Sequence, residues 1–266
     1  MKEYYPGNTY KTSDKKRSSF WDYFFFRTRI YFYIRLIKSI YSYNSKYAKK
    51  GLYTTEEWVE ESNEVLRICE SSGGKVEISG IDNIREVKDE PVVFVSNHMG
   101  LLETLILPSI VEPIKRVTFV VKSSLVEMPL IGNIVGSTNP IIVGRQNPRD
   151  DLMKVISEGI ENLNKNISIL LFPESTRYTD FDRRRFNSLG VKLAVRAKVK
   201  IIPFALKTDF IQQGKYVKDL GKLRREKTVY IKFGKAMKIE GNGKKEHNEI
   251  IEFISENLRN WGTEVL

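Results

Sequence analysis

Histidine and cysteine are scarce in this chain of 266 residues, which contains two histidines and one cysteine. The single cysteine, Cys69, cannot form an internal disulfide, which fits a protein of a reducing compartment. Cys69 lies on the apolar stripe of a predicted helix, where a cysteine usually serves as a small buried hydrophobic residue. Because histidine and cysteine are so few, we expect no metal site and no bound cofactor.

Long uncharged apolar runs are also missing. No segment approaches the roughly 18 to 20 residues that a membrane-spanning helix requires, and no short apolar segment is followed by the small residues of a signal-peptide cleavage site. We find no internal repeat, no low-complexity tract and no glycine-rich phosphate loop. The fractions of hydrophobic residues (41%) and charged residues (29%) are those of a folded globular protein.

Positive charge and aromatic side chains are concentrated near the N-terminus. The net charge is +11, and residues 1–50 hold 12 Lys or Arg, 3 Asp or Glu, and 15 of the 30 aromatic residues. On a helical wheel, residues 25–42 combine a basic arc with a broad aromatic and aliphatic face, which favours a helix lying in a membrane interface. The alternative is a core helix docked on its own domain, but such a helix has little use for so many cations. The candidate membrane-binding residues are Trp21, Phe25, Arg27, Phe32, Arg35 and Lys38.

A second helix is expected to follow, because Thr54 and Glu57 have the spacing of a capping box and a Gly-Gly pair marks the far end. We therefore expect residues 1–72 to form an amphipathic two-helix membrane anchor. Residues 73–266 are expected to form a single α/β domain.

The chain from residue 75 onward alternates between strand-like and helix-like patterns. Helical patterns occupy residues 149–164 and 188–198, and an amphipathic helix of sequence HNEIIEFISENLRNW closes the chain. This alternation predicts an α/β fold with a mostly parallel mixed sheet flanked by helices. The predicted strands are KVEISG, PVVFVS, RVTFVVK, PIIVG, ISILLFP, VKIIPFAL and TVYIKFG.

Polar and charged residues follow several of these strands directly. The carboxyl ends of neighbouring parallel strands meet at one edge of a sheet, where ligands usually bind. The chemistry available there is general-base activation of a substrate hydroxyl by His98, with cations holding an anionic substrate. Taken singly, His98 could be only a helix cap, and Glu174 and Arg177 only a salt bridge. The residues at the strand ends are His98, Lys122, Arg145, Glu174, Arg177, Thr208 and Asp209.

Four short motifs occur in a fixed order within residues 75–235: NHMGLLE, GR, FPESTR and IIPFAL. Their order and spacing resemble the four motifs of the glycerolipid acyltransferases, which move an acyl chain from a thioester to a glycerol phosphate. The chain is most similar to the PlsC-type lysophosphatidic acid (1-acyl-sn-glycerol-3-phosphate) acyltransferases. The resemblance implies the glycerolipid acyltransferase fold for residues 73–266, and phosphatidic acid as the product in phospholipid synthesis. It also implies a peripheral or monotopic enzyme at the cytoplasmic face of the cell membrane. The implied partners are membrane lipids, lysophosphatidic acid, and an acyl carrier protein or CoA thioester as co-substrate.

The resemblance implies a role for each motif residue. His98 would be the general base, and Glu103 would orient its ring as the acid of a Ser-His-Asp triad does. Residues five apart differ by about 140° around a helix, so this pair requires His98 to lie in the turn before the helix, with Asn97 as a potential cap. The remaining implied roles are phosphate binding by Lys122, Arg145 and Arg177, and substrate binding or loop bracing by Glu174, Ser175 and Thr176.

Three residues depart from the family pattern. Glu103 stands in place of the usual aspartate, Ser175 in place of a glycine, and Asn187 in place of a frequent lysine. Outside the motifs, His247 is expected on the surface. The segment DRRRF, residues 182–186, is expected either as a solvated turn or as a contact for lipid head groups or an acidic acyl carrier protein.

Other functions stay open from the sequence alone. The acceptor could be another lysoglycerolipid or glycerol phosphate. The chain could also be a non-catalytic membrane-binding homologue, in which Glu103 marks lost chemistry. A nucleic-acid binder would fit the basic charge, but no recognition motif supports it and we expect no nucleic-acid partner.

Overall fold

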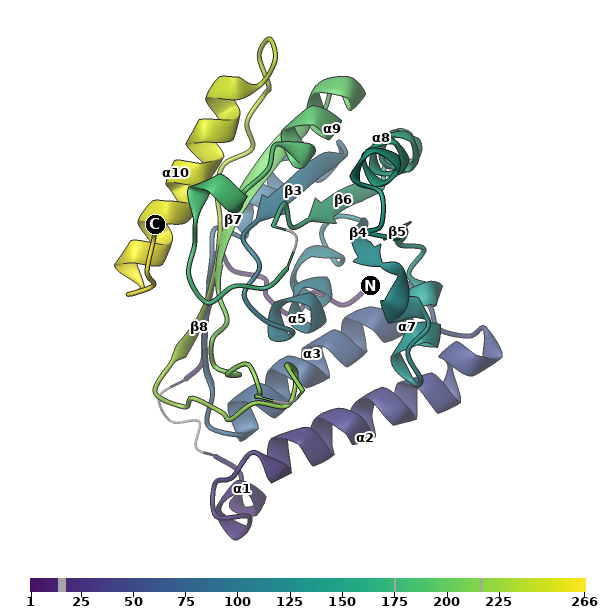
Figure 1. Ribbon diagram of the computed structural model, residues 1–266. Coiled ribbons are helices and arrows are strands. Elements are labelled where there is room, and N and C mark those ends of the chain that lie inside the picture. The colour runs from purple at the N-terminus through teal and green to yellow at the C-terminus, as the bar shows by residue number, and fades with distance from the viewer. Residues whose placement is uncertain (14–17, 175, 216) are drawn as a thin grey trace.

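A mixed β-sheet forms the centre of the computed structural model (Figure 1), which describes residues 1–13, 18–174, 176–215 and 217–266. The strand order is β1-β2-β8-β7-β3-β6-β4-β5. The strands from β7 to β5 run parallel to one another, whereas β8 is antiparallel to β7 and β1 is antiparallel to β2. The strands are β1 (Thr9–Lys11), β2 (Lys75–Ser79), β3 (Val92–Ser96), β4 (Val117–Lys122), β5 (Ile141–Val143), β6 (Ser168–Leu171), β7 (Lys200–Lys207) and β8 (Thr228–Phe233).

The expected strands and helices of the α/β region are all present. The predicted strands are β2 to β8, and the helices predicted at 149–164 and 188–198 are α8 and α9. The capping box of Thr54 and Glu57 opens α3. The helices are α1 (Phe20–Phe24), α2 (Ile30–Lys46), η1 (Ala48–Lys50), α3 (Thr55–Ser71), α4 (Asp82–Arg85), α5 (Leu102–Val111), α6 (Ser123–Val126), α7 (Ile131–Ser137), α8 (Pro148–Asn164), η2 (Arg183–Arg185), α9 (Leu189–Ala197) and α10 (Lys244–Asn260).

Alternate side chains of the central strands face two different layers of helices. In β3, Phe94 packs into a cluster with residues of α2, α3 and α5, whereas Val93 and Val95 pack into a second cluster with residues of α8, α9 and α10. Every residue of β3 and β6 is buried. Helices therefore cover both faces of the parallel part of the sheet, as such strands require.

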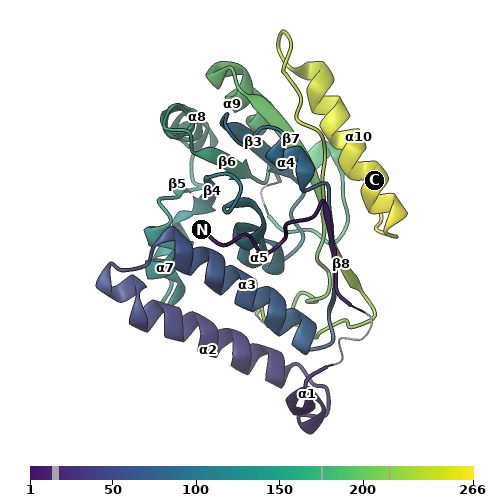
Figure 2. The same ribbon diagram turned by 180° about the vertical axis from the view of Figure 1, so that it is seen from behind.

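The N-terminal region is more closely joined to the sheet than a separate two-helix unit would be. Phe26 and Arg27 have a left-handed backbone (φ 52° for both), and they divide the predicted helix into α1 and α2. α2 lies along the outer side of α3 in Figure 1 and Figure 2, and β1 pairs with β2. The division of the chain at residue 72 stays a prediction.

The inner face of α2 is docked on the protein, which corrects one of the predicted membrane-binding residues. Phe32 is 0% exposed and lies in the core cluster with α3 and α5, so it cannot reach lipid. Arg35 forms an ion pair with Glu64 of α3, with 2.6 Å between its Nη2 and the carboxylate, and its side chain stays 38% exposed, so its membrane role stays a prediction. The alternative of a docked core helix is therefore right for this face of α2.

The outer face of α2 and most of α1 expose apolar side chains instead. Phe26 is 90% exposed and Trp21 is 56% exposed, while Phe25 is half-buried. Arg27 and Lys38 are exposed in the same segment. Among the described residues, no helix is long and apolar enough to cross a membrane. We call these exposed side chains the N-terminal apolar surface: Phe20, Trp21, Tyr23, Phe24, Phe26, Ile30, Ile34, Ile37 and Tyr41.

Candidate active site

His98 lies in the turn between the end of β3 and the start of α5, where the predicted pairing with Glu103 requires it. Its Nδ1 is 3.0 Å from Oε1 of Glu103. Because Nδ1 faces the carboxylate, Nε2 is the ring nitrogen left to accept a substrate proton. The imidazole ring also stacks on Phe172, just after β6, with 4.4 Å between the ring centroids. The ring is therefore held by the carboxylate at its edge and by the phenyl group on its face.

Glu103 is fully buried and hydrogen-bonded through both oxygens. Oε1 accepts the backbone N–H groups of Met99 (2.8 Å) and Gly100 (2.7 Å), and Oε2 accepts the hydroxyl of Thr208. Burial by itself raises the pKa of the Glu103 carboxyl, but the hydrogen bond and charge of His98, aided by the other donors, hold this pKa below its ordinary value. An ionised Glu103 can therefore stabilise a protonated imidazole.

Asn97 joins the ends of two strands and does not cap α5. Its Nδ2 donates to the carbonyl of Leu206 (2.8 Å), and its Oδ1 accepts the N–H of the same residue (2.9 Å). The N-cap position of α5 is Leu101, which makes no side-chain cap. The prediction of Asn97 as a cap is therefore wrong, because this amide instead fixes the His98 turn against β7.

Glu174, which follows β6, braces the His98 turn. Its Oε2 accepts the backbone N–H of His98 at 2.9 Å, and the residue is 2% exposed. Burial raises the pKa of Glu174 to about 7, against the opposing effect of the His98 hydrogen bond. The suggested salt bridge between Glu174 and Arg177 is not formed, since the guanidinium of Arg177 pairs with Asp219 instead.

The loop that contains Glu174 is also held by Asn187, which precedes α9. The side-chain amide of Asn187, at one of the departures from the family pattern, donates to the carbonyl of Pro173. Thr176 is half-buried. Ser175 lies outside the described residues, so its role in substrate binding or loop bracing stays a prediction.

The sheet order ranks the strands that precede the three predicted phosphate-binding residues by their distance from β3. Arg177 follows β6, which pairs directly with β3, whereas Lys122 ends β4 and Arg145 follows β5 at the edge of the sheet. With about 4.8 Å between adjacent strands, these strand ends lie roughly 5, 10 and 14 Å from the end of β3. Lys122 and Arg145 are exposed. The backbone N–H of Tyr178, the residue after Arg177, also donates to the carbonyl of His98 (2.9 Å), so Arg177 is the first candidate to share a substrate with His98.

Two residues of this site were missed or left without a role by the sequence. Asp219, in the loop between β7 and β8, accepts from Nη1 and Nη2 of Arg177, which lies 42 residues earlier. Thr208 binds Glu103, 105 residues earlier. The one signal for Thr208 was its place directly after a predicted strand, and no local pattern marks Asp219. In the part of the chain that the structure describes, no group of three or more His, Cys, Asp or Glu side chains could hold a metal ion.

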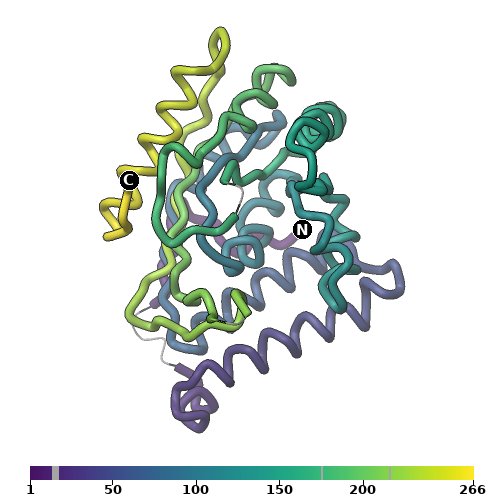
Figure 3. The backbone as a smooth tube through the Cα atoms, in the orientation of Figure 1, coloured from purple at the N-terminus to yellow at the C-terminus, as the bar shows by residue number. Residues whose placement is uncertain are grey.

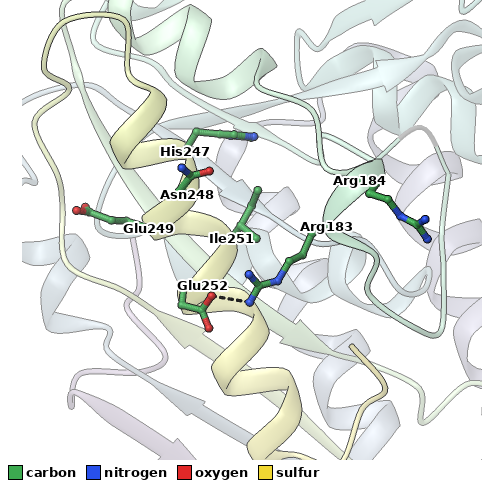
Figure 4. A pocket seen from close by; sticks show the side chains of 7 residues that line it. All are labelled: Arg183, Arg184, His247, Asn248, Glu249, Ile251 and Glu252. Atoms are coloured by element: carbon green, nitrogen blue, oxygen red, sulfur yellow. Dashed lines mark hydrogen bonds and ion pairs between the residues drawn. The ribbon is translucent and has the colours of Figure 1, made fainter. Parts of the chain in front are cut away.

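An open groove of about 540 Å³ lies between η2 and α10 (Figure 4). The arginines of the DRRRF segment along it are engaged in ion pairs, Arg183 with Glu252 (2.5 Å) and Arg184 with Asp182 (2.8 Å). His247, expected on the surface, is half-buried there, and burial lowers its pKa. The residues that line this groove do not include His98 or Glu103.

Comparisons with known proteins agree on one family of enzymes. Residues 75–207, half of the chain, match the family model described as Acyltransferase. The 1-acyl-sn-glycerol-3-phosphate acyltransferase of Pseudomonas aeruginosa is 31% identical over 172 residues, which are 65% of this chain and 63% of that protein. The protein of the same name from Borreliella burgdorferi is 27% identical over 135 residues, 51% of this chain and 52% of that protein. The chain thus spans less than two thirds of the length of these curated relatives.

A solved structure supports the same conclusion at the level of the fold. The crystal structure of the 1-acyl-sn-glycerophosphate (LPA) acyltransferase PlsC from Thermotoga maritima matches with a TM-score of 0.69. The match covers 87% of this chain and 93% of that chain at 18% identity. The segment that matches the family model runs from β2 through β7, and so it contains the His98–Glu103 pair, Thr176 and Arg177. The chain belongs to the acyltransferase family.

Proposed function

We propose that this protein transfers a fatty acyl chain from a thioester to the free hydroxyl of lysophosphatidic acid, giving phosphatidic acid. The observation that carries the proposal is the contact between His98 and the buried Glu103, one strand away from Arg177. The relatives named 1-acyl-sn-glycerol-3-phosphate acyltransferases support the same acceptor.

In the proposed reaction, His98 acts as the general base. Nε2 takes the proton of the acceptor hydroxyl while the hydroxyl oxygen attacks the thioester carbonyl carbon. The carbon–sulfur bond then breaks, and the leaving thiolate takes the proton from the imidazolium. Glu103 holds the ring and offsets the positive charge that forms on it. A positioned general base of this kind typically contributes about 10² to 10⁴ in rate.

The acceptor phosphate would bind at Arg177. A guanidinium can donate two parallel hydrogen bonds to phosphate oxygens, which fixes orientation as well as charge. Lys122 and Arg145 lie further along the same strand edge and would receive more distant anionic groups or steer the substrate.

The N-terminal apolar surface would hold the enzyme on the membrane that contains its acceptor. Its side chains on α2 recur at positions 30, 34, 37 and 41, so they form one stripe on the face opposite the core. Exposed Arg27 and Lys38 could meet anionic head groups, each contributing about 1 kcal/mol at low salt. We propose peripheral or monotopic binding to the cytoplasmic face of the cell membrane.

The direct test is an assay of the purified full chain with lysophosphatidic acid in vesicles. Acyl carrier protein thioester and acyl-CoA are supplied in separate reactions. Both donors give the same phosphatidic acid, so only the rate with each donor shows which one the enzyme uses. Phosphatidic acid is measured by mass spectrometry, and His98→Ala is the control variant.

We expect turnover with at least one donor and its loss in His98→Ala, with folding preserved by circular dichroism. Lysophosphatidylcholine and glycerol 3-phosphate, tested in parallel, reveal a different acceptor. No turnover on any acceptor would indicate a non-catalytic membrane-binding homologue. Activity retained by His98→Ala would remove His98 from the mechanism.

A further inference from the structure

The loop between β7 and β8 folds as a compact element. Its two arms are joined by backbone hydrogen bonds from Gln212 to Lys222 (2.9 Å) and from Arg224 to Phe210 (2.7 Å). The arms pack so closely that a Cβ atom on Gly221 would lie 1.5 Å from the carbonyl oxygen of Gln212. A shift of one arm of the loop would therefore displace the other arm.

One side of the loop is tied to α2. Nη1 of Arg29 donates to the carbonyl of Leu220 (2.6 Å), and the hydroxyl of Tyr33 donates to the carbonyl of Gly221 (3.0 Å). Tyr33 is buried, so its hydroxyl meets this carbonyl away from water. Figure 3 shows the loop, in yellow-green, lying next to the N-terminal helices.

An ion pair strengthens this attachment. Nη2 of Arg225, at the end of the loop, lies 2.8 Å from Oδ1 of Asp22 in α1, and Asp22 is 0% exposed. Nε of the same arginine donates to the carbonyl of Ser72 at the end of α3 (2.8 Å). Breaking a buried pair of this kind is costly, because it leaves an uncompensated charge. The loop is thus fixed to α1, α2 and the end of α3.

The other side of the loop holds Arg177. Asp219, next to the two carbonyl groups bound by α2, accepts from Nη1 and Nη2 of this arginine. The side-chain amide of Gln213 approaches the carbonyl of Arg177 at 3.4 Å. The loop therefore contacts both the N-terminal helices and the guanidinium of Arg177.

We propose that the β7–β8 loop positions Arg177 for the acceptor phosphate, with Asp219 as the positioning residue and α2 as the anchor of the loop. The inference rests on the proposed function, since it takes Arg177 as a ligand of that phosphate. Asp219 occupies the edge of the guanidinium formed by Nη1 and Nη2. The phosphate would take the edge formed by Nε and Nη2, which suits a bidentate contact.

This arrangement links acceptor binding to the segment that would sit on the membrane. Tyr33 belongs to the same helix as the exposed stripe of the N-terminal apolar surface, and Arg29 is the N-cap residue of that helix. A disturbance of α2 would therefore reach Arg177 through a chain of hydrogen bonds, without any contact between α2 and the substrate.

The first test replaces Asp219 in the full chain and measures steady-state kinetics with lysophosphatidic acid in mixed micelles. Asp219→Asn should raise the acceptor KM roughly three- to fivefold, because a partly exposed charge pair contributes up to about 1 kcal/mol. The donor KM should stay the same, which a general loss of folding would not produce. Asp219→Glu, which keeps the charge, should recover part of the effect.

The second test compares two tyrosines of α2. Tyr33→Phe removes the hydroxyl that binds the loop, whereas Tyr31→Phe removes a hydroxyl that accepts from Arg35 within α2 (3.0 Å). Both side chains are buried, so the two changes are matched in size and burial. Tyr33→Phe should raise the acceptor KM at unchanged vesicle binding, and Tyr31→Phe should not. The double variant Tyr33→Phe/Asp219→Asn should be less than additive.

Three results would overturn the proposal. A lower acceptor KM in Asp219→Asn would mean that this carboxylate competes with the phosphate for Arg177. An unchanged KM in Asp219→Asn, with a raised KM in Arg177→Ala, would remove the loop from acceptor binding while leaving the proposed function intact. An unchanged KM in Arg177→Ala would place the phosphate elsewhere, which would contradict the assignment of Arg177 itself.

Discussion

The hydroxyl of Thr208, directly after β7, donates a hydrogen bond to Oε2 of Glu103 at the start of α5. His98 uses the other oxygen, Oε1. A Cβ atom on Gly100 would lie 3.3 Å from Oε2 of Glu103 and 3.4 Å from the hydroxyl oxygen of Thr208, so the three groups are in close contact. Thr208 and the turn together hold a glutamate at a position where the family usually has the shorter aspartate.

Thr208→Val should therefore impair catalysis. Valine keeps the size of threonine but leaves Oε2 of Glu103 buried without its donor, at a cost of about 1–3 kcal/mol. We expect kcat to fall roughly tenfold in Thr208→Val and to stay near the wild-type value in Thr208→Ser. Wild-type kcat in the valine variant would show that the hydroxyl has no positioning role.

Glu103→Gln should lose most activity, because an amide cannot stabilise the protonated His98 ring by charge. A loss of roughly a hundredfold in kcat is expected, within the usual contribution of general-base catalysis. Glu103→Asp keeps the charge but is one methylene shorter, so it should retain part of the activity. Equal activity of the glutamine variant and the wild type would make this residue a purely structural cap of the turn.

Arg177→Ala should weaken acceptor binding more than Lys122→Ala or Arg145→Ala. Arg177 follows the strand next to β3, whereas the other two follow strands further away. Loss of a charge-assisted contact costs about 1.5 to 3 kcal/mol, which raises the acceptor KM roughly ten- to a hundredfold. The acceptor KM of the three variants, measured side by side, shows which cation contributes most. A larger increase for Lys122→Ala than for Arg177→Ala would place the phosphate near the end of β4.

Glu174 should make stability depend on pH. Its folded-state pKa, about 7, is above its ordinary value of 4.5, so its stabilising contribution is complete below pH 4.5 and is lost as pH rises through 7. Glu174→Gln does not titrate and can still accept the N–H of His98. Relative to the wild type, this variant should gain about 2–3 kcal/mol between pH 5 and pH 8. Urea unfolding at the two pH values measures the gain, and a constant difference would contradict the raised pKa.

Substitutions on the N-terminal apolar surface should release the protein from vesicles without unfolding it. Phe24→Ser/Phe26→Ser removes two exposed rings from α1 and the turn after it, and Met153→Ser, on α8, is a control at an exposed apolar side chain outside this surface. Flotation with anionic vesicles should show reduced binding for the double variant only. Deleting residues 1–50 is a poorer test, because it also removes β1 and the buried Phe32. Unchanged flotation of the double variant would place the membrane contact elsewhere.

The sequence by itself determined the strands of the α/β region and the pairing of His98 with Glu103 in a turn. Strands β2 to β8 and helices α8, α9 and α10 follow from short-range patterns of apolar residues, which depend on local geometry. His98 could be placed in a turn because an apolar run ends just before it and the five-residue spacing to Glu103 excludes a shared helix face. The four ordered motifs carried the family resemblance.

Only the tertiary structure decided which residues meet. The strand order places β6 beside β3, and the backbone N–H of Tyr178, the residue after Arg177, donates to the carbonyl of His98. Thr208 and Asp219 reach their partners across 105 and 42 residues. A local pattern does not report such contacts, because pairing of distant segments is set by how the whole sheet packs and by which buried polar groups need partners.

The N-terminal segment shows the same limit. Its apolar periodicity predicts one helix with a single lipid face, but left-handed Phe26 and Arg27 divide this helix, and α2 has two apolar faces. Phe32 lies on the face that packs on the protein, and Ile34 lies on the face that stays exposed. Both side chains satisfy the same helical pattern, so only the position of α3 against α2 distinguishes the residue in the core from the residue at the surface.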